Sequence, residues 1–342
     1  MSTELGCLDA LPRVHLGHAP TPIDQMANLA RGLDGLTLQV KRDDCTGLAF
    51  GGNKVRQLEF YMGEAQARRA DTILITGARQ SNFVRLAAAA ARSLGMECHI
   101  QLEERVVRDD PLYRESGNVL LDRLLGATLH AYPKGEDESG ADRQLEVLAT
   151  DLANKGRRPY VIHLAPGHKP LGALGYVVAA RELLQQLRDA KQSVDTLVVG
   201  SGSGSTHAGL LFGLRAIGST IGVHGVCVRR DAHAQHGRIA ARCGEIAGLL
   251  GVSSPVAETD IQLDDRFLAP GYGLLNDATK DAIERAAREE ALILDPVYTG
   301  KVMAAFLDHA SRAASGQSLL FWHTGGTPAL FSYGSDLTQG QD

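Results

Sequence analysis

The feature that most constrains the fold of this chain is the alternation of short β-branched runs with longer helical patterns. Short apolar runs predict strands at 38–41, 72–76, 98–102, 128–131, 160–163, 196–199, 223–228 and 319–323. Helical periodicity between them predicts helices at 54–69, 82–94, 171–187, 206–217, 277–290 and 300–314. Strands that alternate with helices form parallel sheets with helices on both faces. The sequence therefore predicts an α/β fold.

Length and composition narrow the class of protein. A chain of 342 residues is long for one hydrophobic core, so two packed domains are expected. The net charge is −5 and no basic stripe occurs, which argues against nucleic-acid binding. The five cysteines are odd in number and widely spaced, so neither a disulfide framework nor a metal site is expected. The first 24 residues lack a secretory signal pattern, and the apolar run 87–91 is too short to cross a membrane. A cytoplasmic protein is expected.

One lysine stands at the start of a predicted helix, directly after two glycines. The segment reads GGNKVR at 51–56, and KRDD precedes it at 41–44. Glycines permit a tight turn or a close backbone approach. The positive end of a helix favours a neutral lysine, and a neutral lysine is the nucleophile that forms Schiff bases. Lys54 is therefore either such a nucleophile or a solvated lysine beside a turn.

A glycine–serine loop follows the predicted strand 196–199 and opens a helix. It reads GSGSGSTHAG at 200–209. A strand, such a loop and a helix together point backbone N–H groups at a phosphate. The loop has no Walker lysine and no dinucleotide spacing, so a single isolated phosphate is the better ligand. The alternative is a flexible surface loop.

Four further segments join loops to helices or strands. In GARQSNFVR at 77–85, Ser81 is placed either as an N-cap or as a receptor for a substrate carboxylate. The other three are DPVYTGK at 295–301, WHTGGTP at 322–328 and PGYG at 270–273. Each of these is more often structural than catalytic when it occurs alone. The occurrence of all these segments in this order is a more specific indication of function than any one of them alone.

Together these blocks resemble the tryptophan-synthase-β-like group of pyridoxal-phosphate enzymes (fold type II). Within that group they resemble the branch that contains D-cysteine desulfhydrase and 1-aminocyclopropane-1-carboxylate (ACC) deaminase. The resemblance runs from about residue 12 to about residue 331. The matching blocks are KRDD at 41–44, GGNKVRQLEF at 51–60, QSN at 80–82, LGALGY at 171–176, GSGSTHAG at 202–209, DPVYTGK at 295–301 and HTGG at 323–326.

The resemblance implies a two-domain tryptophan-synthase-β-like fold and a site for pyridoxal 5′-phosphate between the domains. Residues 54–163 would form the small domain, and residues 1–53 and 164–342 the large one. Lys54 would hold the cofactor covalently, Asn82 would contact its 3′ oxygen, and Thr324 would face the pyridine nitrogen. The phosphate would be held by Gly202, Ser203, Gly204, Ser205 and Thr206. The implied catalytic residues are Lys54, Ser81, Tyr272 and Tyr298.

Three positions depart from the family pattern. ACC deaminases have a glutamate where this chain has Thr299, which argues against ring-opening of ACC. Phe83 replaces the usual His or Gln, and PGHKP at 166–170 replaces a glycine–serine–asparagine stretch. Through the cations His168 and Lys169, this loop is a candidate to receive an anionic substrate side chain. The alternative is that Lys169 is solvated.

The resemblance implies a lyase that catalyses β-elimination from a small amino acid. The first substrate expected is D-cysteine, which would give pyruvate, sulfide and ammonia. L-cysteate sulfo-lyase and ACC deaminase activities are the near alternatives, and a non-catalytic protein that binds a phosphate ligand is the distant one. A homodimer is expected by analogy with the family, with no nucleic-acid or membrane partner.

Overall fold

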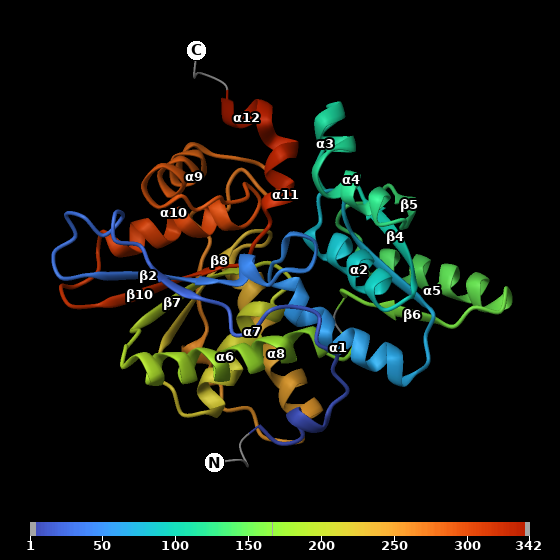
Figure 1. The fold of residues 1–342 in the computed structure, drawn as a ribbon, viewed down its shortest axis with the longest axis horizontal. Helices are drawn as coiled ribbons and strands as arrows, with labels where there is room; N and C mark the ends of the chain where they lie inside the picture. The colour runs from blue at the N-terminus through green and yellow to red at the C-terminus, as the bar shows by residue number, and fades with distance from the viewer. Residues whose placement is uncertain (1–4, 166, 339–342) are drawn as a thin grey trace.

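The larger of two sheets contains six strands in the order β1-β2-β10-β7-β8-β9. The computed structural model describes residues 5–165 and 167–338 (Figure 1). All neighbouring strands in this sheet are parallel except β1, which is antiparallel to β2. The strands are β1 Ile23–Gln25, β2 Thr37–Arg42, β10 Ser318–His323, β7 Thr196–Ser201, β8 Gly222–Cys227 and β9 Gln262–Asp264.

The smaller sheet contains four parallel strands in the order β5-β4-β3-β6. They are β5 Thr128–Tyr132, β4 Glu97–Glu103, β3 Thr72–Ala78 and β6 Pro159–Ile162. All eight strands expected from the sequence are therefore present, and the predicted α/β fold is confirmed. Strands β1 and β9 were not expected, because three residues are too few to show a period of two. The domain boundary at 54–163 remains a prediction, although the smaller sheet lies inside that range.

Helices flank both sheets (Figure 1). Contacts place α7 against β7 and β8, and α10 against β7, β8 and β10; Figure 1 shows α9 and α10 on one face of the larger sheet and α6, α7 and α8 on the other. The helices are α1 Lys54–Ala67, α2 Asn82–Ser93, α3 Pro111–Glu115, α4 Gly117–Leu124, α5 Glu138–Asn154, α6 Leu171–Ala190, α7 Ser205–Ala216, α8 Ala232–Leu250, α9 Asp277–Glu290, α10 Thr299–Ala310, α11 Thr327–Leu330 and α12 Gly334–Thr338. Short 3-10 turns are η1 Leu8–Ala10, η2 Asp43–Cys45, η3 Leu48–Phe50, η4 Glu258–Asp260 and η5 Phe331–Tyr333.

Six helices of the described residues were not predicted from the sequence: the short helices α3, α4, α11 and α12, and the long helices α5 and α8. The polar segment 133–141 reads as a loop, but α5 begins within it at Glu138 because Asp137 caps the helix by accepting a hydrogen bond from the Gly140 N–H at 2.9 Å. Helix α8 was not expected at all. Its 19 residues include three glycines and many polar side chains, which hide the helical period.

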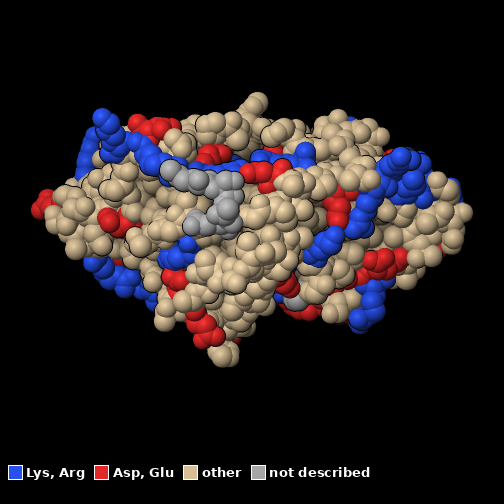
Figure 2. Space-filling view, turned by 90° about the horizontal axis from the view of Figure 1, so that it is seen from below, with Lys and Arg blue, Asp and Glu red and all other residues tan. Residues whose placement is uncertain are grey.

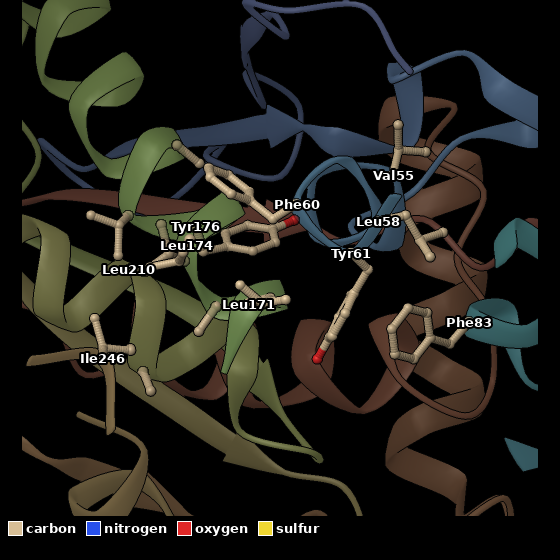
Figure 3. Packing of buried hydrophobic residues seen from close by; sticks show 14 of the residues in the cluster. Val55, Leu58, Phe60, Tyr61, Phe83, Leu171, Leu174, Tyr176, Leu210 and Ile246 are labelled. Atoms are coloured by element: carbon tan, nitrogen blue, oxygen red, sulfur yellow. The ribbon is translucent and has the colours of Figure 1, made fainter. Parts of the chain in front are cut away.

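Helix α1, which begins at Lys54, is held against α6 by close backbone contact. Gly172 and Gly175 of α6 face α1, and a side chain at Gly175 would collide with the carbonyl oxygen of Arg56. Figure 3 shows the apolar side chains of α1 and α6 packed together in the core. The glycines of LGALGY therefore have a packing role, which is to let α6 approach the helix that carries the lysine.

A buried aspartate ties four segments together beside the same helix. The carboxylate of Asp43 accepts hydrogen bonds from Thr21 Oγ1, from Arg56 Nε and Nη2, from the Tyr176 hydroxyl at 2.6 Å and from Trp322 Nε1 at 2.8 Å. Asp43 has no exposed surface. The KRDD and GGNKVR blocks thus meet in a buried polar network that fixes the start of α1 relative to β2, α6 and β10.

The surface carries charges of both signs. Figure 2 shows Lys and Arg interspersed with Asp and Glu over the face seen from below. Within residues 5–165 and 167–338, no helix combines the length and the apolar character needed to span a membrane.

Candidate active site

One pocket gathers most of the residues that the sequence singles out. It lies where the carboxyl ends of strands from both sheets meet, which is where ligands bind in parallel sheets. We call it the Lys54 pocket. Ten of the site residues that were expected from the sequence line it: Lys54, Ser81, Asn82, Gly202, Ser203, Gly204, Thr206, Tyr272, Tyr298 and Thr324. Ser205 lines an adjoining smaller cavity instead.

Lys54 presents its amine to the pocket without an acidic partner. Among the described residues, its Nζ has one hydrogen-bond acceptor, Gln57 Oε1 at 3.4 Å, and it lies 5.0 Å from the ring centre of Phe83. Burial lowers the pKa of Lys54 to about 8. The cause is desolvation, which disfavours the charged form. A substantial fraction of such an amine is neutral near physiological pH, and a neutral amine can attack an aldehyde.

The glycine–serine loop forms an open anion receptor at the start of α7. Gly204 is the N-cap residue with φ +91°, and no side chain caps the helix. The hydroxyl oxygen of Thr206 accepts hydrogen bonds from Asn53 Nδ2 and Gln57 Nε2, each at 2.9 Å. Because that oxygen already accepts twice, its own hydrogen remains to be donated. Uncapped N–H groups and a directed hydroxyl are the donors that a phosphate requires.

The side chain of Asn82 is held in one orientation by buried neighbours. Its Oδ1 accepts from Arg85 Nη1 at 3.1 Å and from Asn118 Nδ2 at 3.0 Å. The Asn82 amide group therefore keeps its two N–H donors for the pocket. Ser81 is the N-cap of α2, because its hydroxyl oxygen accepts from the Phe83 N–H at 3.2 Å. The N-cap prediction for Ser81 is confirmed, and its hydroxyl hydrogen is still free to donate.

Two tyrosines stand on another side of the pocket. The hydroxyls of Tyr272 and Tyr298 are 2.7 Å apart. Burial raises the pKa of both phenols, so both stay protonated at neutral pH. One hydroxyl donates to the other, and the remaining O–H hydrogen can be donated to a ligand. Lys301 holds the loop that carries Tyr272, because its Nζ donates to the carbonyl oxygens of Leu268 and Gly271.

Thr324 and Thr299 occupy different environments. Thr324 lines the Lys54 pocket, and its carbonyl oxygen accepts from the Asn53 N–H at 2.9 Å. Thr299 is fully buried, and its hydroxyl donates to Asp295 Oδ1 at 2.7 Å. The hydroxyl of Thr299 therefore serves the start of α10 and does not line the pocket.

The cations expected from the loop 166–170 line the adjoining smaller cavity and not the Lys54 pocket. Lys169 Nζ pairs with Glu64 Oε1 at 3.1 Å, and its side chain is 60% exposed. His168 stacks on His163 with ring centres 3.7 Å apart. Neither side chain lines the Lys54 pocket. Pro166 of this loop lies outside the described residues.

The cations that do line the pocket are arginines that the sequence reading missed. They are Arg105, Arg229 and Arg238, and Glu138 lies with them. Glu138 Oε1 accepts from Arg229 Nη1 and Arg230 Nη2, both at 2.6 Å, and its other oxygen pairs with Arg238. Arg105 and Arg229 each stand two residues beyond the end of a parallel strand, β4 and β8. That position was the available signal, since ligands gather at strand carboxyl ends.

Comparisons with known proteins agree with this geometry. Residues 14–325 match the model of the pyridoxal-phosphate dependent enzyme family. The chain is 41% identical over 328 residues to D-cysteine desulfhydrase of Salmonella typhi, which covers 95% of this chain and 97% of that protein. The same identity and coverage hold for D-cysteine desulfhydrase of Salmonella newport.

Solved structures resemble the fold as well. A crystal structure of an ACC deaminase homologue is 36% identical, covers 98% of this chain and 99% of its own, and superposes with a TM-score of 0.85. O-ureido-L-serine synthase superposes with a TM-score of 0.66 at 19% identity, with 98% of this chain and 96% of its own covered, and this match supports the fold alone.

Proposed function

The chain belongs to the family of pyridoxal-phosphate-dependent enzymes, in the group that joins the D-cysteine desulfhydrases and the ACC deaminases, and on that premise we propose that it catalyses β-elimination from a small amino acid. The products would be a 2-oxo acid, ammonia and the group that leaves the β-carbon. D-cysteine is the first candidate substrate, because the relatives are named for it. The observation that carries the proposal is that one pocket combines a lysine amine, an uncapped helix N-terminus and two hydroxyl donors.

The donors of the pocket fit pyridoxal phosphate. The uncapped start of α7 and the Thr206 hydroxyl would hold the phosphate group. The Asn82 amide would donate to the oxygen beside the aldehyde, and the Lys54 amine would bind the aldehyde carbon. Within the described part of the chain, these groups have no alternative acidic partner. The distant alternative, a non-catalytic phosphate binder, gives no reason for a desolvated lysine beside the phosphate receptor.

The residues around the cofactor site would each have a separate role in the reaction. When bound, pyridoxal phosphate withdraws electrons from the α-carbon of the substrate. The Lys54 Nζ would take up the α-proton, because a lysine pKa of about 8 allows it to hold and release a proton near neutral pH. Ser81 and the start of α2 would receive the substrate carboxylate. One hydroxyl of the pair Tyr272 and Tyr298 would donate a hydrogen bond to the departing group, while the other donates within the pair.

The environment of Thr299 supports β-elimination over ring-opening of ACC. Its hydroxyl is committed to Asp295, and the pocket itself contributes the neutral Thr324. A neutral partner leaves a pyridine nitrogen largely unprotonated, which weakens electron withdrawal by the ring. Elimination of a good β-leaving group tolerates this loss better than cleavage of a cyclopropane ring does.

The test is a substrate panel with the purified holoenzyme. D-cysteine and β-chloro-D-alanine are expected to yield 2-oxo acid, with sulfide from D-cysteine alone, and ACC is expected to react far more slowly. Turnover of ACC at a rate comparable with either substrate would refute the argument from Thr299. Absence of 2-oxo acid from every β-substituted alanine would refute the proposed reaction.

We also propose that residues 54–163 form a small domain and that the chain forms a homodimer. Light scattering after size-exclusion chromatography is expected to give twice the chain mass of 36.5 kDa. A monomer mass at micromolar concentration would contradict the dimer.

A further inference from the structure

The two tyrosines of the Lys54 pocket, Tyr272 and Tyr298, rest on a small hydrophobic cluster that has no role in the chemistry described above. We call this cluster the tyrosine support, and its buried members are Val106, Tyr113, Val297 and Tyr333. They come from the segment after β4, from α3, from the turn before α10 and from η5. Both pocket tyrosines pack against it. Residues far apart in the chain therefore meet directly behind the hydroxyl donors of the pocket.

Tyr333 is the member of the tyrosine support that bonds to the loop carrying Tyr272. Its hydroxyl donates to the carbonyl oxygen of Gly273 at 2.9 Å, and the residue is almost fully buried. Gly273 has φ +69°, and a Cβ atom there would lie 2.6 Å from Val106 Cγ2 and 3.2 Å from the Tyr333 hydroxyl oxygen. The second glycine of PGYG therefore lets the backbone after Tyr272 approach the tyrosine support closely.

The ring of Tyr333 is itself held by neighbours on other segments. It meets the ring of Tyr113 edge to face, with ring centres 5.7 Å apart. The guanidinium carbon of Arg108 lies 4.8 Å from the ring centre of Tyr333 and 5.3 Å from that of Tyr113. Arg108 Nη1 donates to Asp336 at 2.6 Å, and its Nε donates to Asp110 at 2.9 Å. These contacts restrict the Tyr333 phenol to one orientation, the one that reaches the Tyr272 loop.

The backbone on each side of Tyr272 is bonded to a different side chain. Before it, the carbonyl oxygen of Gly271 accepts from Lys301 Nζ at 3.0 Å. After it, the carbonyl oxygen of Gly273 accepts from Tyr333. Loss of the second bond would free the backbone on the C-terminal side of Tyr272, and the phenol would move with it. The place of the Tyr272 hydroxyl in the pocket therefore depends on a residue that does not line the pocket.

We propose that Tyr333 is a positioning residue for the elimination step, an inference that rests on the proposed function. Its hydrogen bond to Gly273 keeps Tyr272 where the tyrosine hydroxyls can donate their remaining hydrogen to the group that leaves the β-carbon. Tyr333 acts through Tyr272 and touches neither substrate nor cofactor. Its effect depends on the leaving group, because a basic leaving group such as hydrosulfide gains more from a hydrogen-bond donor than chloride does.

The primary test is Tyr333→Phe, which removes the hydroxyl and keeps the ring. The holoenzyme is assayed for 2-oxo acid with D-cysteine and with β-chloro-D-alanine. We expect kcat/KM for D-cysteine to fall about tenfold relative to kcat/KM for β-chloro-D-alanine. A general loss of structure would lower both values together. An unchanged ratio of the two values would overturn the inference and leave the proposed reaction intact.

The matched control is Tyr160→Phe. Tyr160 is also buried, and its hydroxyl donates to Glu64 at 2.6 Å, so this variant likewise loses one hydrogen bond and keeps its ring. Tyr160 does not line the Lys54 pocket, and the ratio of the two kcat/KM values is expected to equal that of the parent. A fall as large as in Tyr333→Phe would overturn the specific role of Tyr333.

Amide hydrogen exchange of the substrate-free holoenzyme tests the same contact without turnover. We expect the segment 271–276 to exchange about fivefold faster in Tyr333→Phe than in the parent, and at the parent rate in Tyr160→Phe. Unchanged exchange in Tyr333→Phe would overturn the positioning role. Absence of 2-oxo acid from both substrates in the parent would refute the proposed reaction, and the exchange rates would then decide by themselves whether Tyr333 positions Tyr272.

Discussion

Two adjacent aspartates of the KRDD block are expected to differ sharply in their contribution to stability. Asp43 is fully buried and accepts hydrogen bonds from Arg56, Tyr176 and Trp322. In Asp43→Asn, the charge disappears and an amide can place N–H donors against the Tyr176 and Trp322 donors. Removal of one partner from a buried ion pair costs about 3–5 kcal/mol. Asp43→Asn is therefore expected to destabilise the fold by an amount in this range.

The expected loss in the free energy of unfolding can be expressed as a fall in the melting temperature, Tm. An unfolding entropy of about 2.1 cal/mol/K per residue gives about 0.7 kcal/mol/K for 342 residues. The expected fall in Tm for Asp43→Asn is then about 4–7 °C. Asp44→Asn is the matched control, since Asp44 pairs with the quarter-exposed Arg42. An ion pair that water still reaches contributes about 0–1 kcal/mol, so the Tm of Asp44→Asn should fall by less than about 2 °C.

The assay is calorimetric or circular-dichroism melting of both variants and the parent, loaded with cofactor, at neutral pH. Burial alone would raise the pKa of Asp43, but the charges of Arg56 and Lys41 and the hydrogen bond from Tyr176 together outweigh burial and hold that pKa below its ordinary value of 3.8. A lowered pKa gives stability that is present above the ordinary pKa and is lost as the pH falls through the folded-state pKa. The difference between parent and Asp43→Asn should therefore shrink under acidic conditions. Equal Tm values for the two variants would refute the reasoning.

The remaining predictions concern the Lys54 pocket. Lys54→Ala is expected to abolish the absorbance band of the covalently bound cofactor and all turnover while the circular-dichroism spectrum stays unchanged, and full activity of this variant would disprove the role of Lys54. The rate at which pyridoxal phosphate attaches to the apoprotein should rise with pH and level off above about 8, because the pKa of Lys54 is lowered to about 8 and the neutral amine attacks; a rise that continues to pH 10 would contradict this. Arg85→Met frees the Asn82 amide to rotate, so it should shift the absorbance maximum of the bound cofactor and weaken cofactor binding about tenfold, whereas an unchanged spectrum and affinity would show that Asn118 alone is sufficient.

The positions of the longer strands along the chain could be predicted because short runs rich in apolar and β-branched residues mark them, as TILITGA does in β3 and TLVVGS does in β7. Lys54 and the glycine–serine loop could be located because each stands at the start of a helix, Lys54 after two glycines and the loop after a strand. Arg105 and Arg229 were missed because the sequence reveals that an arginine is charged but not which way its side chain points in the fold. Their importance depends on which strands lie side by side, and β4 and β8 belong to different sheets.

Other differences between the sequence-based expectations and the structure also have identifiable physical causes. Lys169 is ion-paired because Glu64 lies on α1, about a hundred residues earlier, and no spacing rule connects them. The first turn of α5 was read as a loop, because the acidic residues that suit a helix N-terminus also suit a turn. Helix α8 lacks a clear apolar stripe in the sequence, although Ile239, Cys243 and Ile246 lie on its buried side.

The pairing of β2 with β10 sets the order in which the two sheets can fold while the chain is being synthesised. Leu38 lies beside Leu319, so the second strand of the chain must wait for the last one before the larger sheet can close. The smaller sheet needs only residues 72–162, and a ribosome delivers these while more than half of the chain is still unmade. Thr324 emerges after β10. A nascent chain can therefore possess a finished small sheet and an exposed Lys54 long before it possesses a pocket, and during that interval the unpaired β2 edge is open to wrong partners.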